Sequence, residues 1–163
     1  CLNEGRVAWD DARKALNGEP GYVRSPAGKN WGAPVGEMTF SEDLTLGIRG
    51  LVMDQGKTGG TGHTGSKGDT MQSRTSYYGK GSRLGENLQY GATTSGTDII
   101  MQLYIDAGVP NRGHRDNIMD GNFKITGIFS GPHPKFKFET GIQYGDVYTC
   151  NEACKATKAE FKA

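Results

Sequence analysis

Between residues 2 and 149 the sequence contains no cysteine. It also lacks a long apolar run, since residues 99–105 form its strongest apolar stretch and are too few to cross a bilayer. No signal-peptide core is visible, although a mature chain whose signal had been removed would look the same. Neither sign of charge is in excess, because 19 Lys and Arg accompany 18 Asp and Glu. We therefore expect neither nucleic acid nor an anionic membrane surface as a partner.

Motifs for covalent hydrolysis are also missing. Ser66, Ser73 and Ser76 do not lie in a nucleophile elbow, and no cysteine lies near a histidine motif. The sequence has no His-Glu-x-x-His pattern of a zinc protease. Glycine is abundant instead: its 26 residues are about twice the average usage of ~7% and are dispersed through turns. This composition favours a loop-rich α+β domain.

The three cysteines lie at the two ends of the chain, at Cys1, Cys150 and Cys154. Such clustering is typical of disulfide bonds that form in an oxidising compartment and hold the chain ends. Cys150 and Cys154 are four residues apart and could share one helix face, so we expect Cys1 to form a disulfide with one of them. The third cysteine would then be a free thiol or a bridge to another chain. A lipidated Cys1 is also compatible with the sequence.

Apolar periodicity and capping residues predict several helices in one domain of 163 residues. Ser41 is a good cap for the second helix, and Ser95 or Thr97 for the last clear one, which we expect to stop at Gly108. The helices are expected at residues 4–16, from 42 onward, at 70–79 and before 108.

The last third of the chain has the alternating pattern of half-buried strands, at residues 124–129 and 136–142. Residues 131–134 (Gly-Pro-His-Pro) predict a turn between them, with His133 as a solvated loop residue. An antiparallel hairpin that follows helices indicates an α+β fold rather than a parallel doubly wound sheet.

Four side chains are the best candidates in the sequence for metal binding or proton transfer: His63, Glu86, Asp106 and His114. Each lies in a short motif that is typical of a turn or of the end of an element. Two imidazoles and two carboxylates can together bind a divalent ion or transfer a proton near neutral pH. Asp106 follows a helix, where the dipole disfavours an anion, so we expect a cation or a hydrogen-bonded histidine beside it. The alternative is that each histidine only bonds loop backbone.

Three motifs occur in one order: residues 61–65 (Thr-Gly-His-Thr-Gly), 85–88 (Gly-Glu-Asn-Leu) and 113–118 (Gly-His-Arg-Asp-Asn-Ile). Together they resemble the CAP superfamily, also called SCP/TAPS, which includes cysteine-rich secretory proteins, antigen 5 and plant pathogenesis-related proteins. The His-Arg-x-Asn-Ile form is closest to the bacterial and protist branch. The similarity extends from the first helix to about Tyr148.

The resemblance implies an α+β fold, a three-layer α-β-α sandwich around a small antiparallel sheet. It would comprise residues 1–149, with residues 150–163 as a Cys/Lys/Ala-rich C-terminal tail. It also implies a cleft in which His63 and His114 bind a divalent metal, with zinc as the expected ion, while Glu86 and Asp106 support them. Family members usually have a glutamate where this chain has Asp106, so the carboxylate is set back by about 1.5 Å.

The function implied by the resemblance is a secreted, extracellular or cell-surface binding protein. Its partner would be a lipid, a sterol, a glycan or another protein, and an intermolecular disulfide is compatible with the odd cysteine count. One alternative is a structural extracellular component that uses the fold as a rigid block. Another is a metal-dependent hydrolase with Glu86 as the base, although we expect a protein that is not an enzyme.

Overall fold

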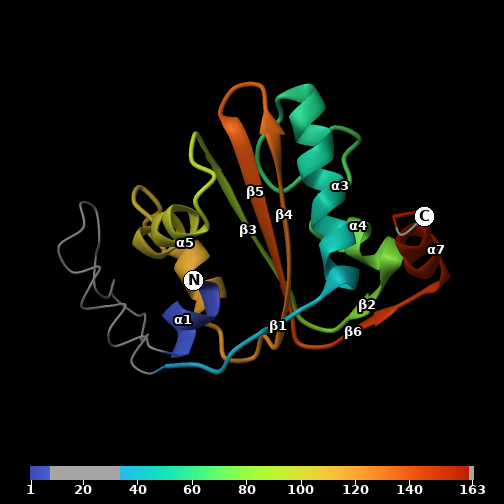
Figure 1. Ribbon diagram of the computed structural model, residues 1–163, viewed down its shortest axis with the longest axis horizontal. Helices are drawn as coiled ribbons and strands as arrows, with labels where there is room; N and C mark the ends of the chain where they lie inside the picture. The colour runs from blue at the N-terminus through green and yellow to red at the C-terminus, as the bar shows by residue number, and fades with distance from the viewer. Residues whose placement is uncertain (8–33, 162–163) are drawn as a thin grey trace. The chain divides into compact units, whose positions relative to one another are not determined.

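The computed structural model describes residues 1–7 and 34–161, and it has the α+β arrangement that the sequence predicts (Figure 1). The chain divides into two compact units, of which the first comprises residues 1–38 and 93–121 and the second residues 39–92 and 122–163. Within the described ranges, no helix combines the length and the apolar character needed to span a membrane. The predicted first helix beyond Val7 lies outside the described residues.

Three helices form the described part of the first unit: α1 (Leu2–Val7), α5 (Gly96–Ile105) and α6 (Gly113–Ile118). Tyr104 of α5 is buried, and its hydroxyl lies 3.6 Å from the sulfur of Met119. Gly5 allows α1 to approach this ring, because a Cβ at Gly5 would lie 2.5 Å from the Tyr104 hydroxyl oxygen. Ser95 caps α5 as predicted, but the helix ends in a left-handed residue at Asp106 rather than at Gly108.

The second unit contains two sheets with helices beside them. Its strands are β1 (Thr39–Phe40), β2 (Gly79–Gly81), β3 (Leu84–Gly91), β4 (Ile125–His133), β5 (Lys137–Gly145) and β6 (Tyr148–Cys150). Its helices are α3 (Glu42–Thr58), α4 (Met71–Tyr78) and α7 (Glu152–Glu160). The larger sheet has the order β1-β4-β5-β3, with β1 parallel to β4 and the other pairs antiparallel, and β2 pairs with β6.

Helix α3 forms where the sequence predicts it, because both of its ends are capped. The Ser41 side chain accepts a hydrogen bond from the backbone N–H of Leu44, and Gly59 ends the helix in the left-handed conformation. The helix lies across one face of β4 and β5 (Figure 1). Its apolar side chains lie on one buried face, at Leu44, Ile48, Leu51 and Val52. Burial of each such side chain contributes about 1.5–3 kcal/mol.

The predicted hairpin is present as β4 and β5, but its turn lies further along the chain than expected. Pro132 and His133 belong to β4, so the turn falls between His133 and Lys137. His133 was predicted to be solvated, and this is wrong: its side chain is buried, and Nε2 donates to the carbonyl of Gly60 at 2.8 Å. The carbonyl of Gly60, just after α3, thus has a side-chain partner that the two prolines flanking His133 gave no reason to expect.

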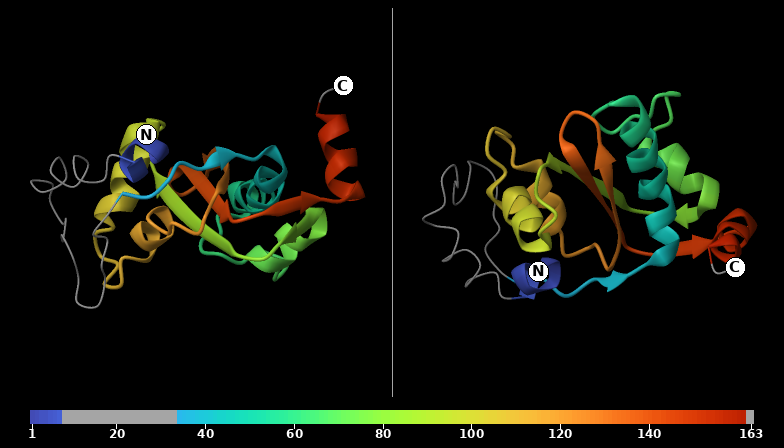
Figure 2. Two further views of the ribbon diagram at one scale, coloured as in Figure 1. Left: turned by 90° about the horizontal axis from the view of Figure 1, so that it is seen from below. Right: turned by 45° about the horizontal axis from the view of Figure 1, so that its top comes forward.

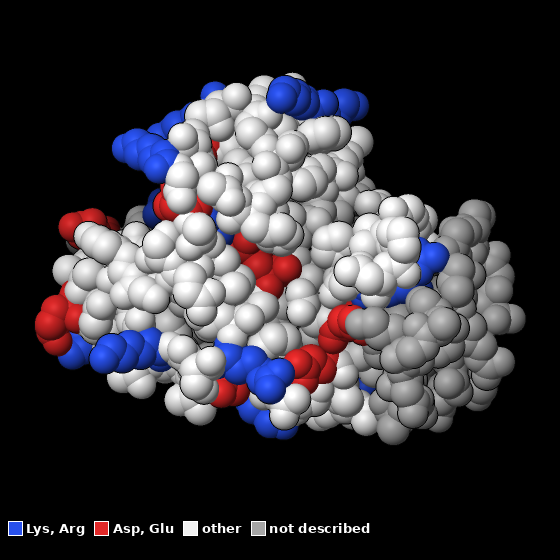
Figure 3. Space-filling view, turned by 180° about the vertical axis from the view of Figure 1, so that it is seen from behind, with Lys and Arg blue, Asp and Glu red and all other residues white. Residues whose placement is uncertain are grey.

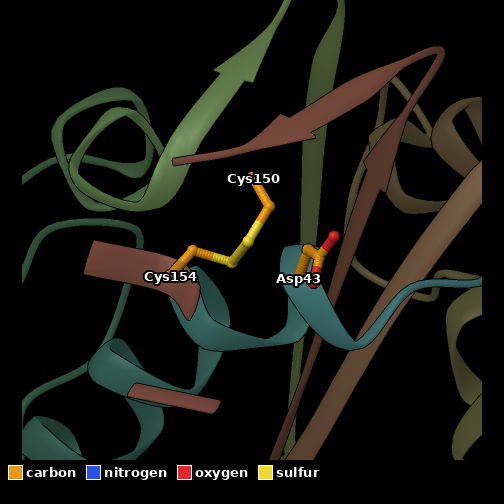
Figure 4. A group of neighbouring side chains, drawn as sticks. All are labelled: Asp43, Cys150 and Cys154. Carbon is orange, nitrogen blue, oxygen red and sulfur yellow. A yellow bond between two sulfur atoms is a disulfide. The ribbon is translucent and has the colours of Figure 1, made fainter. Parts of the chain in front are cut away.

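The disulfide joins Cys150 to Cys154, whereas Cys1 is an exposed free thiol (Figure 4). The predicted bridge from Cys1 to the C-terminal segment is therefore wrong. Cys150 lies in β6 rather than on the same helix face as Cys154, which is in the first turn of α7. Asn151 begins this helix by accepting a hydrogen bond from the Cys154 N–H, and the sharp change from strand to helix brings the two Cα atoms to 5.6 Å.

The disulfide lies at one end of the second unit. There α7 lies beside β6, β2 and α4 (Figure 2). Lys158 of α7 lies 2.5 Å from a carboxylate oxygen of Asp43, at the start of α3. The expected Cys/Lys/Ala-rich C-terminal tail therefore contains a helix, which is fastened by a covalent bond and an ion pair.

Close packing of α3 on the sheet depends on glycine at position 141. A Cβ at Gly141 would lie 2.3 Å from Cγ1 of Ile48, so a side chain there must displace the helix. We expect Gly141→Ala to lower the free energy of unfolding in urea by about 1–3 kcal/mol. Gly96→Ala is the control, because nothing lies within 4 Å of its added Cβ, and it should change stability by less than about 0.5 kcal/mol. Equal effects of the two substitutions would contradict this account.

Candidate functional site

The loop that carries His63 is fixed by hydrogen bonds to the residue before it. Gly62 has a φ of 87°, its N–H donates to the Tyr90 hydroxyl at 2.9 Å, and its carbonyl accepts from Gln55 Nε2 at 2.6 Å. The Tyr90 hydroxyl donates in turn to Gln55 Oε1 at 2.7 Å. This closed ring of three residues ties the loop to α3 and β3, so it limits the positions that His63 can take.

His63 is paired with Glu86, which lies near the start of β3 rather than in the expected turn. Nδ1 of His63 donates to Oε1 of Glu86 at 2.9 Å. Arg74 of α4 approaches the same carboxylate, with Nη2 at 2.9 Å from Oε2 and 3.2 Å from Oε1. The Glu86 side chain is only 2% exposed, whereas that of His63 is 55% exposed. A buried carboxylate thus orients a solvent-accessible imidazole, and an arginine balances its charge.

Sequence reasoning did not identify Arg74, although this residue organises the surroundings of His63. Its Nη1 donates to the backbone carbonyls of His63 at 3.2 Å and Asp69 at 2.9 Å. Thr70 and Ser73 begin α4 with a capping box, which sets the position of Arg74 one residue later. The pairing of Arg74 with Glu86 joins a helix to a strand, and no local sequence pattern predicts such a contact.

The second pair consists of Asp106 and His114 in the first unit. Oδ1 of Asp106 accepts from Nδ1 of His114 at 2.6 Å, and Oδ2 accepts from the His114 backbone N–H at 3.0 Å. The Asp106 side chain is 2% exposed, and its shorter length does not prevent contact with the imidazole. The expected compensation for a carboxylate at the C-terminus of α5 is therefore present as a hydrogen-bonded histidine.

Two arginines complete the C-terminus of α5. Arg112 donates from Nη1 to the Asp106 carbonyl, and Arg115 donates from Nε to the Tyr104 carbonyl and from Nη2 to the Ile105 carbonyl at 3.0 Å. Both side chains are buried, so the carbonyls that a helix end leaves without partners are satisfied by cations. Arg115 therefore has a structural role at this helix end. The structure thus brings the four predicted residues together as two pairs, one within each unit.

A third acid, Glu139 on β5, was not identified from the sequence. Its partner across the β3–β5 pairing is Tyr90, and Glu86 lies further along the same face, opposite Gln143. Glu139 is fully buried, and neither carboxyl oxygen has a hydrogen-bond partner within the described structure. Burial, and secondly the charge of Glu86, raise the pKa of Glu139 to about 7. The alternating pattern of residues 136–142 did not single out this residue, and β5 is a central strand of the larger sheet.

The described residues contain one further group of potential metal ligands, formed by Asp43, Cys150 and Cys154 (Figure 4). Their potential ligand atoms lie within 4.8 Å of one another. The two sulfurs, however, are joined in the disulfide and cannot act as thiolate ligands. This group is therefore not a metal site in the oxidised protein.

A comparison with protein-family models finds the cysteine-rich secretory protein family, CAP, over residues 4–151. The chain belongs to the CAP family. The resemblance seen in the motifs around His63, Glu86 and His114 is thereby confirmed. A search of curated proteins finds no match.

Two solved structures resemble the CAP domain described above. An outer surface protein of Borrelia burgdorferi is 13% identical, with a TM-score of 0.57 over 83% of this chain and 84% of that one. An extracellular protein with an SCP domain from Bacillus anthracis is 14% identical, with a TM-score of 0.54 over 69% of this chain and 35% of that one. At these identities the likeness shows the fold, and it confirms an α+β sandwich of the CAP type.

Glu139 predicts a specific dependence of stability on pH. Its ordinary pKa of 4.5 rises to about 7 in the folded protein, so between these values the folded state binds one more proton than the unfolded state. The contribution of protonated Glu139 to the free energy of unfolding is therefore fully present below pH 4.5. It is lost as the pH rises through 7, which lowers the free energy of unfolding by roughly 2–3 kcal/mol in total. We expect Glu139→Gln to remove this decline in urea unfolding measured from acid to neutral pH. Glu152→Gln, at an exposed position, is the control, and parallel curves for wild type and Glu139→Gln would contradict the assignment.

Proposed function

We propose that this protein is an extracellular or cell-surface interaction module in which His63 and His114, each held by a carboxylate, serve as ligands of a divalent cation, with zinc as the best candidate. One observation carries the proposal: Nδ1 of His63 and Nδ1 of His114 are each bonded to a buried carboxylate. Metal-binding histidines are typically oriented in this way, through the ring nitrogen that does not bind the metal. Membership of the CAP family, and the surface or extracellular description of both structural neighbours, support the location.

The donor set fits a borderline cation. Imidazole nitrogen and carboxylate oxygen are both zinc ligands, and a water molecule can complete an open site. The side chain of His63 is more than half exposed, so a cation can reach it from solvent. The residues expected to bind are therefore His63 and His114, with Glu86 and Asp106 holding their rings.

Binding is better supported than hydrolysis. A metal-dependent hydrolase would need Glu86 to accept a proton from a bound water. The carboxylate of Glu86 already accepts from His63, and both of its oxygens lie within hydrogen-bond distance of Arg74 Nη2. Because its charge is balanced and its oxygens are engaged, Glu86 is better suited to orient a histidine than to act as a base.

The partner is expected to be neutral or of mixed charge. On the face drawn in Figure 3, basic and acidic side chains are interspersed, and no large field of one sign is present. The formal net charge of +1 agrees with this distribution. Electrostatic attraction of a polyanion therefore has little support, and recognition would depend on shape and hydrogen bonding, as with an uncharged lipid, sterol, glycan or protein surface.

Zinc titration by calorimetry tests the proposal. All proteins should carry Cys1→Ser, because the exposed Cys1 thiol is itself a zinc ligand. We expect saturable binding that His63→Ala or His114→Ala weakens by at least about tenfold, and that Glu86→Gln or Asp106→Asn weakens by about 10- to 100-fold. The stoichiometry also reports whether the two histidines share an ion.

The matched control for this titration is His133→Gln, because the two ring nitrogens of His133 bond to backbone groups, the Gly60 carbonyl and the Lys135 N–H. Its zinc affinity should equal that of the parent protein, and circular dichroism should show that each variant is folded. Equal heats in the parent and in both histidine variants would contradict metal binding by these pairs.

The free thiol of Cys1 favours a second candidate, a structural component linked covalently between chains. Cys1 is exposed, and its sulfur lies 3.1 Å from the Thr97 hydroxyl rather than against another cysteine. If this candidate holds, mild oxidation will double the apparent mass in non-reducing electrophoresis, and Cys1→Ser will prevent the shift. A protein that stays monomeric while its thiol reacts freely with a maleimide would contradict the candidate.

A further inference from the structure

A groove of about 510 Å³ lies between α3 and α4, and the loop before α4 contributes Lys67 and Asp69 to it. This size is within the range of small-molecule sites, about 300–1,000 Å³. Leu46 and Gly50 of α3 contribute to the lining from one side, and Tyr77 of α4 from the other. The zinc proposal does not use this groove, which shares only Arg74 with the surroundings of Glu86.

Gly50 lines this groove at a helix position where glycine is unfavourable. It lies in the interior of α3 and is exposed, where glycine costs about 0.5–1 kcal/mol relative to alanine. Packing does not demand it, because a Cβ there would meet only Cδ of Arg74, at 3.9 Å. A side chain at this position would project over the groove lining, so the unfavourable glycine keeps the groove open.

The remaining lining defines the chemistry of the occupant. Tyr77 is 65% exposed, and its ring meets Tyr78 edge to face at 4.9 Å, which leaves an aromatic surface for stacking. Asp54 and Asp69 place two carboxylates in the groove beside Lys67 and Arg74, so the charges of the lining balance and a neutral ligand with hydroxyl donors is favoured. Hydrogen bonds from Ser66 to Asp54 lower the pKa of that carboxyl, so it is ionised at neutral pH.

We propose that the α3–α4 groove binds a neutral sugar residue of a glycan. The ring stacks on Tyr77, Asp54 and Asp69 accept from hydroxyl groups, and Lys67 donates to a sugar oxygen. An acyl chain would leave these polar groups desolvated without partners, and a phosphate would face two carboxylates. A pyranose ring has both the apolar face and the paired donors and acceptors that the lining requires.

Titration followed by ¹⁵N–¹H NMR tests the assignment, with four neutral probes: chitotriose, cellotriose, maltotriose and galactobiose. We expect at least one to shift the amides of Gly50, Lys67 and Ser73 saturably, with affinity at least about tenfold weaker in Tyr77→Ala and in Gly50→Leu. Tyr77→Phe retains the ring and should bind like the parent protein. Met53→Ala alters an exposed α3 residue outside the groove lining and should do the same.

Three results would overturn the proposal. The first is the absence of a saturable shift with all four sugars, and the second is an equal affinity in the parent protein, Tyr77→Ala and Gly50→Leu. The third is binding of inorganic phosphate or a heparin-derived disaccharide with no binding of the neutral probes, which would assign the groove to anions. The unchanged spectrum away from the groove verifies that Gly50→Leu is folded, and Tyr77→Ala supplies an independent test at an exposed position.

Discussion

The buried ion pair between Arg74 and Glu86 is the interaction on which the arrangement of polar side chains around His63 depends. It joins α4 to β3, and Arg74 also holds the backbone of His63. Loss of one partner from a buried pair typically costs about 3–5 kcal/mol, because the other charge is left without compensation. The orientation of the His63 ring therefore follows from a contact between helix and strand rather than from its own loop. A family motif centred on Glu86 describes only half of this contact.

Two carboxyl groups on one face of the sheet have opposite surroundings. Glu86 has a guanidinium and an imidazole beside it, so the protein provides partners for its negative charge. Glu139 has no hydrogen-bond partner in the described structure, and the phenol of Tyr90, its cross-strand neighbour, donates its proton to Gln55. The difference arises from register, since Glu86 reaches the end of the sheet beside α4 whereas Glu139 lies opposite Tyr90. The same side chain can thus be an anchored anion or a protonated acid within one layer.

Local signals were sufficient for the elements that depend on local chemistry. Ser41 and Ser95 cap α3 and α5 as expected, since capping and apolar periodicity act within a few residues. The positions of three polar side chains of the second unit could not be predicted from local signals. Glu86 follows a glycine and seemed to lie in a turn, yet cross-strand pairing places it inside a sheet. Arg74 and His133 are defined by partners distant in sequence, and no local pattern predicts their burial.

The position of Pro132 within β4 has a consequence for self-association. Along the described part of the chain, β1 pairs with β4 only at Ile125 and Thr126, so the outer side of β4 continues as a sheet edge. An edge with free N–H groups can recruit a strand from another molecule. Here the Ile128 N–H already donates to Thr45 at 3.3 Å, and Pro132 has no N–H to offer. Gly56 lets α3 close over the Pro132 carbonyl, so the edge is poorly suited to the intermolecular strand addition that leads to aggregation.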